Sequence, residues 1–182
     1  GTVTKVDKIP NCDYAVVKNA KIYYAGNDEQ PDRLFFSKTG NPEDVTDVLG
    51  EREADDIIGG FFDLHSNEMP ITGLVVYQGS IVAFKQDCIY VVRGDLALEY
   101  TVEKMTVSTG CSVPCSIQVA NNMVFYMGYD GVYYITSTTQ DLMIVEPISD
   151  KITPEFENFD VYCSIYFKSK YFLFGEGKTL YF

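Results

Sequence analysis

The chain has 182 residues, of which 46% are apolar and 14% are aromatic, with no Trp. This composition is that of a globular protein, and the abundance of Tyr and Phe favours β-structure. The net charge of −12 argues against tight binding to nucleic acids, because a phosphate-binding protein needs a basic surface. No apolar segment is long enough for a transmembrane helix and residues 1–10 do not resemble a signal peptide, so we expect no membrane association.

Four segments of the chain repeat one pattern. Each has a short β run, a two-residue polar turn, an aromatic-rich run, a second turn and a third run. Turns rich in Asn and Gly suit the positive φ angles of tight hairpins. The repeat units are predicted near residues 12–50, 70–107, 115–149 and 163–182, with first turns at Asn19-Ala20, Gln78-Gly79, Asn121-Asn122 and Ser169-Lys170.

Further strands are expected in the connections between these units. The segments 97–107 and 142–149 have the composition of fourth strands, and residues 2–6 are a candidate for the strand that the last unit lacks. Helix is scarce, since residues 51–58 and 149–159 each favour one short helical turn at most.

Units of three or four short strands, spaced 43 to 59 residues apart, are typical of propeller blades. We therefore predict an all-β fold, namely a β-propeller or propeller-like array of about four antiparallel β-meander blades, as a single domain over residues 1–182. The blades either close a ring by themselves or form part of a larger ring, and a β-sandwich of the same strands is the alternative. Gly1 is not an initiator Met and Phe182 ends a predicted strand, so we expect a processed product or a fragment of a longer chain.

The five cysteines are odd in number and lack the spacing of a disulfide scaffold, which indicates thiols in a reducing compartment. Cys111 and Cys115 form a C-x3-C pair, but a structural zinc site needs four nitrogen or sulfur ligands and the only histidine is His65. Cys115 and Cys163 instead recur at the head of a run beginning CSI, where a small apolar thiol fits a packing position. We expect no metal and no cofactor.

No catalytic residue is expected either. His65 lies beside Ser66 and near Asp63, but neighbours in sequence rarely form a Ser-His-Asp triad, so a loop histidine explains it better. A glycosidase needs two carboxylates at a defined separation, which a run of acids in one loop does not supply. Two acidic clusters are therefore assigned to a solvated surface: Asp28, Glu29 and Asp32, and Glu51, Glu53, Asp55 and Asp56.

An aromatic series runs along the predicted strands. Aromatic side chains stack on bases in some binding proteins, but their repeated placement on strands predicts that most belong to the core between blades. The series comprises Tyr23, Tyr24, Phe35, Phe36, Tyr126, Tyr133, Tyr134, Tyr166, Phe172 and Phe174.

Three stretches carry a family resemblance: DRLFFSKTGNPEDV at 32–45, PITGLVVYQGSIVAFKQDCIYVV at 70–92 and NNMVFYMGYDGVYYI at 121–135. Together, and in this order, they resemble β-propeller structural proteins of tailed bacteriophages and prophages, described as tail nozzle or hub, or packaged-DNA stabilisation, proteins. The similarity extends over residues 12–182, and family members are commonly longer.

The resemblance implies a non-enzymatic virion component, assembled in the host cytoplasm, whose copies form a ring between head and tail through which the genome passes. Its implied partners are other virion proteins, namely portal, adaptor or tail proteins, and further copies in a homo-oligomeric ring. An acidic conduit wall would repel phosphates and let the duplex slide.

Two other functions stay open from the residues alone. The first is a β-propeller module that binds a protein or a glycan, which predicts a funnel with exposed aromatic side chains at its mouth. The second, ranked behind it, is a propeller glycosidase, which requires two carboxylates from different blades in a central pocket.

Overall fold

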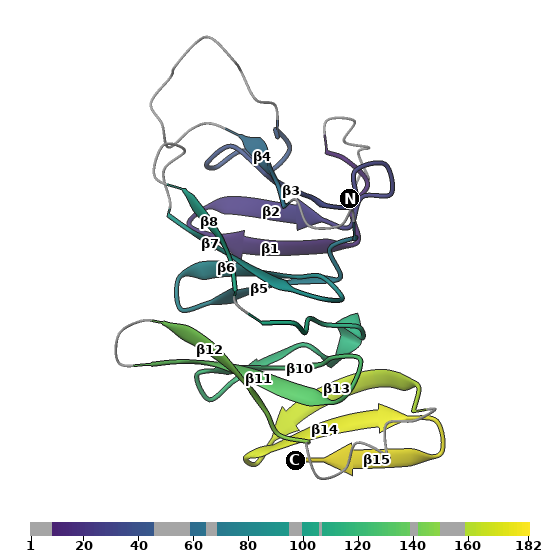
Figure 1. The fold of residues 1–182 in the computed structure, drawn as a ribbon. Coiled ribbons are helices and arrows are strands. Elements are labelled where there is room, and N and C mark those ends of the chain that lie inside the picture. Colours follow the sequence, from purple (N-terminus) through teal and green to yellow (C-terminus); the bar gives the residue numbers. More distant parts are fainter. Residues whose placement is uncertain are drawn as a thin grey trace. The chain divides into compact units, whose positions relative to one another are not determined.

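The computed structural model describes residues 9–45, 59–64, 69–94, 100–105, 107–138, 142–149 and 159–182. The described residues form four antiparallel β-sheets and one short 3₁₀ helix (Figure 1). In every sheet the strands are neighbours in chain order, which is the meander predicted for each repeat unit. The predicted all-β class is therefore confirmed.

The strands have the following bounds. The first sheet consists of β1 (Tyr14–Lys18), β2 (Lys21–Ala25), β3 (Arg33–Phe36) and β4 (Gly60–Asp63). The second consists of β5 (Gly73–Tyr77), β6 (Ser80–Phe84), β7 (Ile89–Arg93) and β8 (Thr101–Lys104). The third consists of β9 (Gln118–Ala120), β10 (Met123–Met127), β11 (Val132–Ser137) and β12 (Met143–Pro147), and the 3₁₀ helix η1 (Pro114–Ser116) precedes it. The fourth, coloured yellow-green to yellow in Figure 1, consists of β13 (Val161–Phe167), β14 (Lys170–Gly175) and β15 (Lys178–Tyr181).

The fourth strands predicted within 97–107 and 142–149 are present as β8 and β12. The first sheet differs from its prediction, because its fourth strand is β4, beyond the expected limit at residue 50. The strand expected at 2–6, the helical turn expected at 51–58 and most of the segment 149–159 lie outside the described residues.

The first hairpin turns are where the sequence predicts them in three sheets, with positive φ at Asn19, Asn121 and Gln78. In the fourth sheet the predicted turn at Ser169-Lys170 is wrong by one residue, because Lys168 and Ser169 have the positive φ angles. The reason is register: this turn pairs Tyr166 with Tyr171 and Ser164 with Leu173, which places Tyr171 and Leu173 on the buried face. A slip of one residue would expose both.

The chain divides into two compact units. The first comprises Gly1–Ala83 and Tyr90–Lys104, and the second comprises Phe84–Ile89 and Met105–Phe182. The first unit thus holds the first sheet and most of the second, while the second unit holds the third and fourth sheets and the turn between β6 and β7.

An aromatic cluster forms part of the core of the first unit. The ring of Phe62 lies 4.9 Å from that of Phe36 and 5.0 Å from that of Tyr100, measured between centroids. The hydroxyl groups of Tyr100 and Tyr23 are hydrogen-bonded at 2.7 Å, and the ammonium of Lys21 lies 5.3 Å from the Phe36 ring centroid. Because Tyr100 immediately precedes β8, this face of the first sheet packs against the second.

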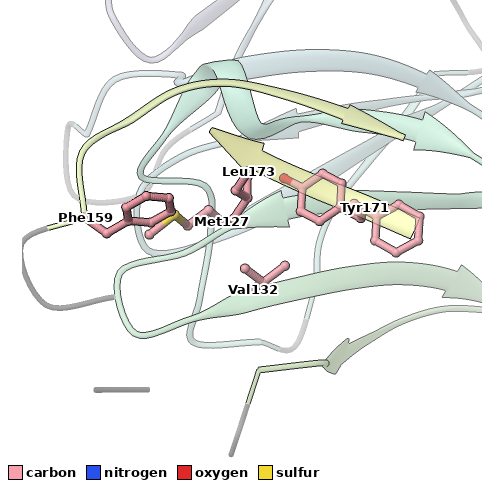
Figure 2. Close-up of a cluster of buried hydrophobic side chains, with 6 residues drawn as sticks. Met127, Val132, Phe159, Tyr171 and Leu173 are labelled. Atoms are coloured by element: carbon pink, nitrogen blue, oxygen red, sulfur yellow. The ribbon is translucent and has the colours of Figure 1, made fainter. Parts of the chain in front are cut away.

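In the second unit, one core cluster lies between the third and fourth sheets. Its buried members come from β10, β11, β14 and the residue pair before β13: Phe125, Met127, Val132, Phe159, Tyr171 and Leu173. Figure 2 shows five of these side chains, labelled, gathered in one cluster. Burial of so many large apolar side chains fixes the fourth sheet on the third.

Candidate assembly surface

The outer face of the fourth sheet is apolar and uncovered in the described structure. Alternate residues of β13, β14 and β15 point to this face, and the pairing aligns Ile165 with Phe172 and Phe172 with Tyr181. The exposed fractions are 49% for Ile165 and 60% for Tyr181. We define the terminal face as Ile165, Phe167, Phe172, Phe174 and Tyr181.

Ring contacts and lysines complete the terminal face. The Phe172 ring lies 6.2 Å from that of Phe174 and 5.8 Å from that of Tyr181, so the aromatic side chains form one continuous layer. The ammonium of Lys170 lies 4.3 Å from the Tyr181 ring centroid, and that of Lys168 lies over Phe167. The surface is therefore apolar at its centre and positive at one end.

The positions of Phe172 and Phe174 are buried in the other sheets. Tyr23, Phe125 and Phe172 are each the third residue after the first hairpin turn of their sheet. The exposed fraction is 1% for Tyr23 and 7% for Phe125, whereas Phe172 is half-buried. Two residues further on, Met127 is 5% exposed and its counterpart Phe174 is 37% exposed. Within each unit these positions are covered by the following sheet. The terminal face is thus a core surface that lacks its cover among the described residues.

Polar contacts fix the opposite face of the fourth sheet. The Ser116 carbonyl, at the end of η1, accepts a hydrogen bond from the Tyr171 hydroxyl. The Ser116 hydroxyl donates to the Val113 carbonyl at 2.6 Å and accepts from the Met127 amide at 2.8 Å. The Gln118 side-chain amide donates to the Ser164 carbonyl at 3.2 Å. These bonds hold the terminal face on a rigid base, which suits a docking surface.

A second exposed apolar face lies on the first sheet, on the side away from Tyr23. The pairing places Val17 opposite Ile22, and Tyr24, Phe35 and Phe61 in one row across β2, β3 and β4. Val17 and Phe61 are exposed, and the Arg33 guanidinium lies 3.7 Å from the Phe61 ring centroid. We define the opening face as Val17, Ile22, Tyr24 and Phe61.

An open hollow of about 500 Å³ adjoins Phe35 in the first unit. The hollow is lined by Asn27, Asp28 and Glu29 among others. The side-chain amide of Asn27 donates a 2.8 Å hydrogen bond to the Asn11 carbonyl. Asp28 and Glu29 are exposed at this hollow, beside the buried Phe35.

The cysteines differ from their predicted packing role. Cys115 lies in η1 and Cys163 in the middle of β13, and both are exposed, so the packing prediction is wrong for this pair. The buried thiols are Cys88 and Cys111. Burial raises the pKa of Cys111 to about 11, which leaves the thiol protonated and unreactive near neutral pH.

The described structure includes Cys111 and Cys115 in no metal-binding group, although burial, and Cys163 lying close by, raise the pKa of the Cys115 thiol. Among the described residues, no group of three or more His, Cys, Asp or Glu side chains is placed to hold a metal ion. His65, Ser66 and the acidic cluster at 51–56 lie outside the described residues, and Asp63 forms an ion pair with Arg33 at 2.6 Å. In the described segments, no helix is long and apolar enough to cross a membrane.

The aromatic series is only partly in the core. Four of its members are buried: Tyr23, Phe35, Phe36 and Tyr126. The others are half-buried or, in the case of Phe174, exposed. The terminal face could not be predicted from the sequence, because Phe and Tyr residues on a strand are expected in the core of every repeat unit. The available signal was that the last repeat unit has three predicted strands, where the second and third units have a predicted fourth.

No family model matches the chain, and no curated protein is significantly similar to it.

Proposed function

We propose that the chain is a non-enzymatic structural component of a tailed-bacteriophage or prophage virion, at the head-to-tail connection or in the tail nozzle or hub. In this proposal the four sheets are successive units of a propeller-like array, and copies of the chain line part of the conduit for the genome. Portal, adaptor or tail proteins are its partners.

The observation that carries the proposal is the terminal face. Phe172, Phe174 and Tyr181 form an apolar surface, and the positions of Phe172 and Phe174 are core in the other sheets. Such a surface is costly in a protein that acts alone. It is favourable in a protein that is buried in a larger particle, because the same area then stabilises the assembly.

The resembling stretches support the proposal from the sequence. Residues 32–45 contain β3, residues 70–92 contain β5, β6 and most of β7, and residues 121–135 contain β10 and most of β11. The resemblance is therefore carried by strands of three different sheets in their order along the chain, and not by one local motif.

The conduit part of the proposal rests on charge. The net charge of −12 gives an acidic protein that repels DNA, which suits passage of a duplex. Half of the 26 acidic residues, including those at 51–56, lie outside the described residues, so an acidic wall stays a prediction. We expect no measurable DNA binding at physiological salt. In a gel-shift assay, we also expect no shifted DNA band when the salt concentration is lowered.

The test is the protein content of virions. Particles from the strain whose genome encodes the chain are purified by density gradient and analysed by mass spectrometry, and we expect the chain in intact, DNA-filled particles. Failure to detect the chain in purified, DNA-filled particles contradicts the proposal. Phe174→Asp, on the terminal face, is expected to reduce incorporation, whereas Val119→Asp, at an exposed position of β9, is not.

The hollow beside Phe35 favours a second candidate, a module that binds a glycan or a protein. Asp28 and Glu29 line the hollow and would accept hydrogen bonds from the hydroxyl groups of a sugar. A glycan array probed with the chain and with Phe35→Ala tests the glycan-binding form of this candidate: selective binding that is lost in the variant supports it, and a blank array contradicts it.

A further inference from the structure

We propose that Cys115 and Cys163 form a modification site: oxidation joins the two side chains in a disulfide that fastens η1 to β13. The oxidant is a low-molecular-weight disulfide, such as oxidised glutathione. Both cysteines belong to the second unit, and the inference does not depend on the proposed function.

Hydrogen bonds hold Cys115 against the strand on both sides of Cys163. The Cys115 thiol donates to the Val161 carbonyl oxygen, with 3.5 Å between the sulfur and the oxygen. The Cys115 carbonyl oxygen accepts a hydrogen bond from the Ser164 hydroxyl at 2.7 Å. A disulfide needs Cα atoms within roughly 7 Å of each other. Direct contacts with Val161 and Ser164, which flank Cys163 in the strand, place the two cysteines within reach of a bridge.

The electrostatics of the thiols agree with this placement. Burial raises the pKa of the Cys115 thiol, and the negative charge of a Cys163 thiolate raises it as well. Both side chains are exposed to water, which screens charges from one another. The two sulfur atoms must therefore be close for one charge to act on the other, although they are far apart in the sequence.

The backbone around Cys163 is able to adjust. The pairing of β13 with β14 aligns Val161 with Gly175 and Cys163 with Phe174, so Tyr162 is the extra residue of a β-bulge. A bulge interrupts the regular ladder and re-aims the side chains beside it. The Cys163 side chain can therefore turn toward η1 without a change in the strand pairing from residue 164 onward.

The other partner, η1, is held in a fixed position. The Ser116 hydroxyl accepts a 2.8 Å hydrogen bond from the Met127 amide and donates a 2.6 Å bond to the Val113 carbonyl. The Gln118 side-chain amide donates to the Ser164 carbonyl at 3.2 Å, which ties the start of β9 to β13. Fixed positions raise the effective concentration of one thiol at the other, so closure of the disulfide is favoured.

The remaining cysteines are poorly placed to compete. Cys88 and Cys111 are fully buried, and Cys12 belongs to the first unit. The Cys111 thiol also donates to the Val113 carbonyl oxygen at 3.2 Å. A link within the C-x3-C motif would require Cys111 to leave this buried site, so the expected link joins Cys115 to β13.

The reaction consists of two thiol–disulfide exchanges. One cysteine thiolate attacks a sulfur of oxidised glutathione; a protein–glutathione S–S bond forms, the original S–S bond breaks, and the departing glutathione thiolate takes up a proton. The second cysteine then attacks the protein sulfur of the mixed disulfide and releases the second glutathione in the same way. The two cysteines lose two electrons and two protons, and the two glutathione molecules gain them.

Peptide mapping detects the link directly. The reduced chain is incubated with oxidised glutathione, alkylated, and digested with trypsin in the absence of reductant. Cleavage after Lys104, Lys151 and Lys168 separates residues 105–151, which contain Cys111 and Cys115, from residues 152–168, which contain Cys163. We expect these two peptides to be joined, with a combined mass two hydrogens below their sum.

Single substitutions assign the link. The joined peptides are expected to disappear in Cys115→Ser and in Cys163→Ser, and to remain in the control variant Cys12→Ser. Oxidation of the wild-type chain should raise the midpoint of thermal unfolding by at least about 5 °C, because the link restricts the unfolded chain. A reductant should reverse this rise, and Cys115→Ser should not show it.

Several outcomes overturn the inference. The first is a chain that carries glutathione on both Cys115 and Cys163, since the two thiols would then be unable to reach each other. The second is a disulfide confined to residues 105–151, and the third is a link between two copies, seen as a dimer on a non-reducing gel. Complete linkage with an unchanged unfolding midpoint would overturn the fastening of η1 to β13.

Discussion

The hydroxyl of Tyr171 donates a hydrogen bond to the carbonyl oxygen of Ser116, and both groups are buried. This bond joins the middle of the fourth sheet to the segment that precedes the third, and it lies directly beneath the terminal face. The position of that face therefore depends on a polar contact that cannot be predicted from the sequence.

Replacing Tyr171 with Phe tests the contact. Tyr171→Phe leaves a buried carbonyl without its donor and is expected to lower the free energy of unfolding by about 1–3 kcal/mol. The control is Tyr126→Phe, because the buried Tyr126 hydroxyl has no hydrogen-bond partner among the described residues, and we expect a change below about 0.5 kcal/mol. Urea unfolding measures both, and equal losses would contradict the assigned role of the bond.

Gly110 is expected to tolerate no side chain. A Cβ there would lie 2.0 Å from the Lys85 carbonyl oxygen and 2.7 Å from that of Cys88, and backbone atoms cannot move aside. Gly110→Ala should therefore cost more than about 3 kcal/mol. Gly40→Ala meets no atom within 4 Å and has only its positive φ of 69° to strain it, so about 1 kcal/mol is expected. Thermal unfolding that ranks the two variants in the reverse order would refute this packing.

The buried thiol of Cys111 should make stability depend on alkaline pH. Burial raises its pKa from 9.0 to about 11 in the folded chain. The folded state therefore keeps the proton more tightly, and the resulting stabilisation is complete below pH 9.0 and is lost as the pH rises to about 11.

The matched variant is Cys111→Ala. This variant lacks the titrating group. Between pH 9.0 and about 11, the free energy of unfolding should therefore fall by about 2 kcal/mol less in the variant than in the wild type. Parallel stability curves for the two proteins would show that the thiol ionises alike in the folded and unfolded chain.

Thiol labelling tests the placement of the cysteines. A neutral maleimide should modify the exposed Cys115 and Cys163 in the native chain, and the buried Cys88 and Cys111 only after denaturation. Peptide mapping by mass spectrometry identifies the labelled positions. A chelator should leave the unfolding midpoint unchanged; stabilisation by added zinc would instead revive the C-x3-C hypothesis.

Much of the fold could be predicted from local chemistry. Asn19 and Asn121 indicate hairpin turns because Asn adopts positive φ readily, and the alternation of apolar residues indicates the strands. The turn at Lys168-Ser169 was misplaced because neither residue favours positive φ, and only the burial of Tyr171 and Leu173 fixes it.

The candidate surface could not be predicted, for a different reason. Phe125 and Phe172 are the same residue at the same position of the repeat, and they differ in whether a sheet lies over them. Exposure of this kind depends on long-range packing between sheets, which local patterning does not encode. The prediction that Cys115 and Cys163 pack in the core failed likewise, since η1 displaces the CSI motif of residue 115 from the strand.

The central claim is that the terminal face is covered when the protein is in its working assembly. Hydroxyl-radical footprinting of the dilute chain and of purified particles measures this at Phe174 and Tyr181, with the 92%-exposed Tyr129 as the reference. We expect oxidation of Phe174 and Tyr181, relative to Tyr129, to drop at least about tenfold in particles, in keeping with burial at the centre of an interface. Equal oxidation in the dilute chain and in particles would contradict the account.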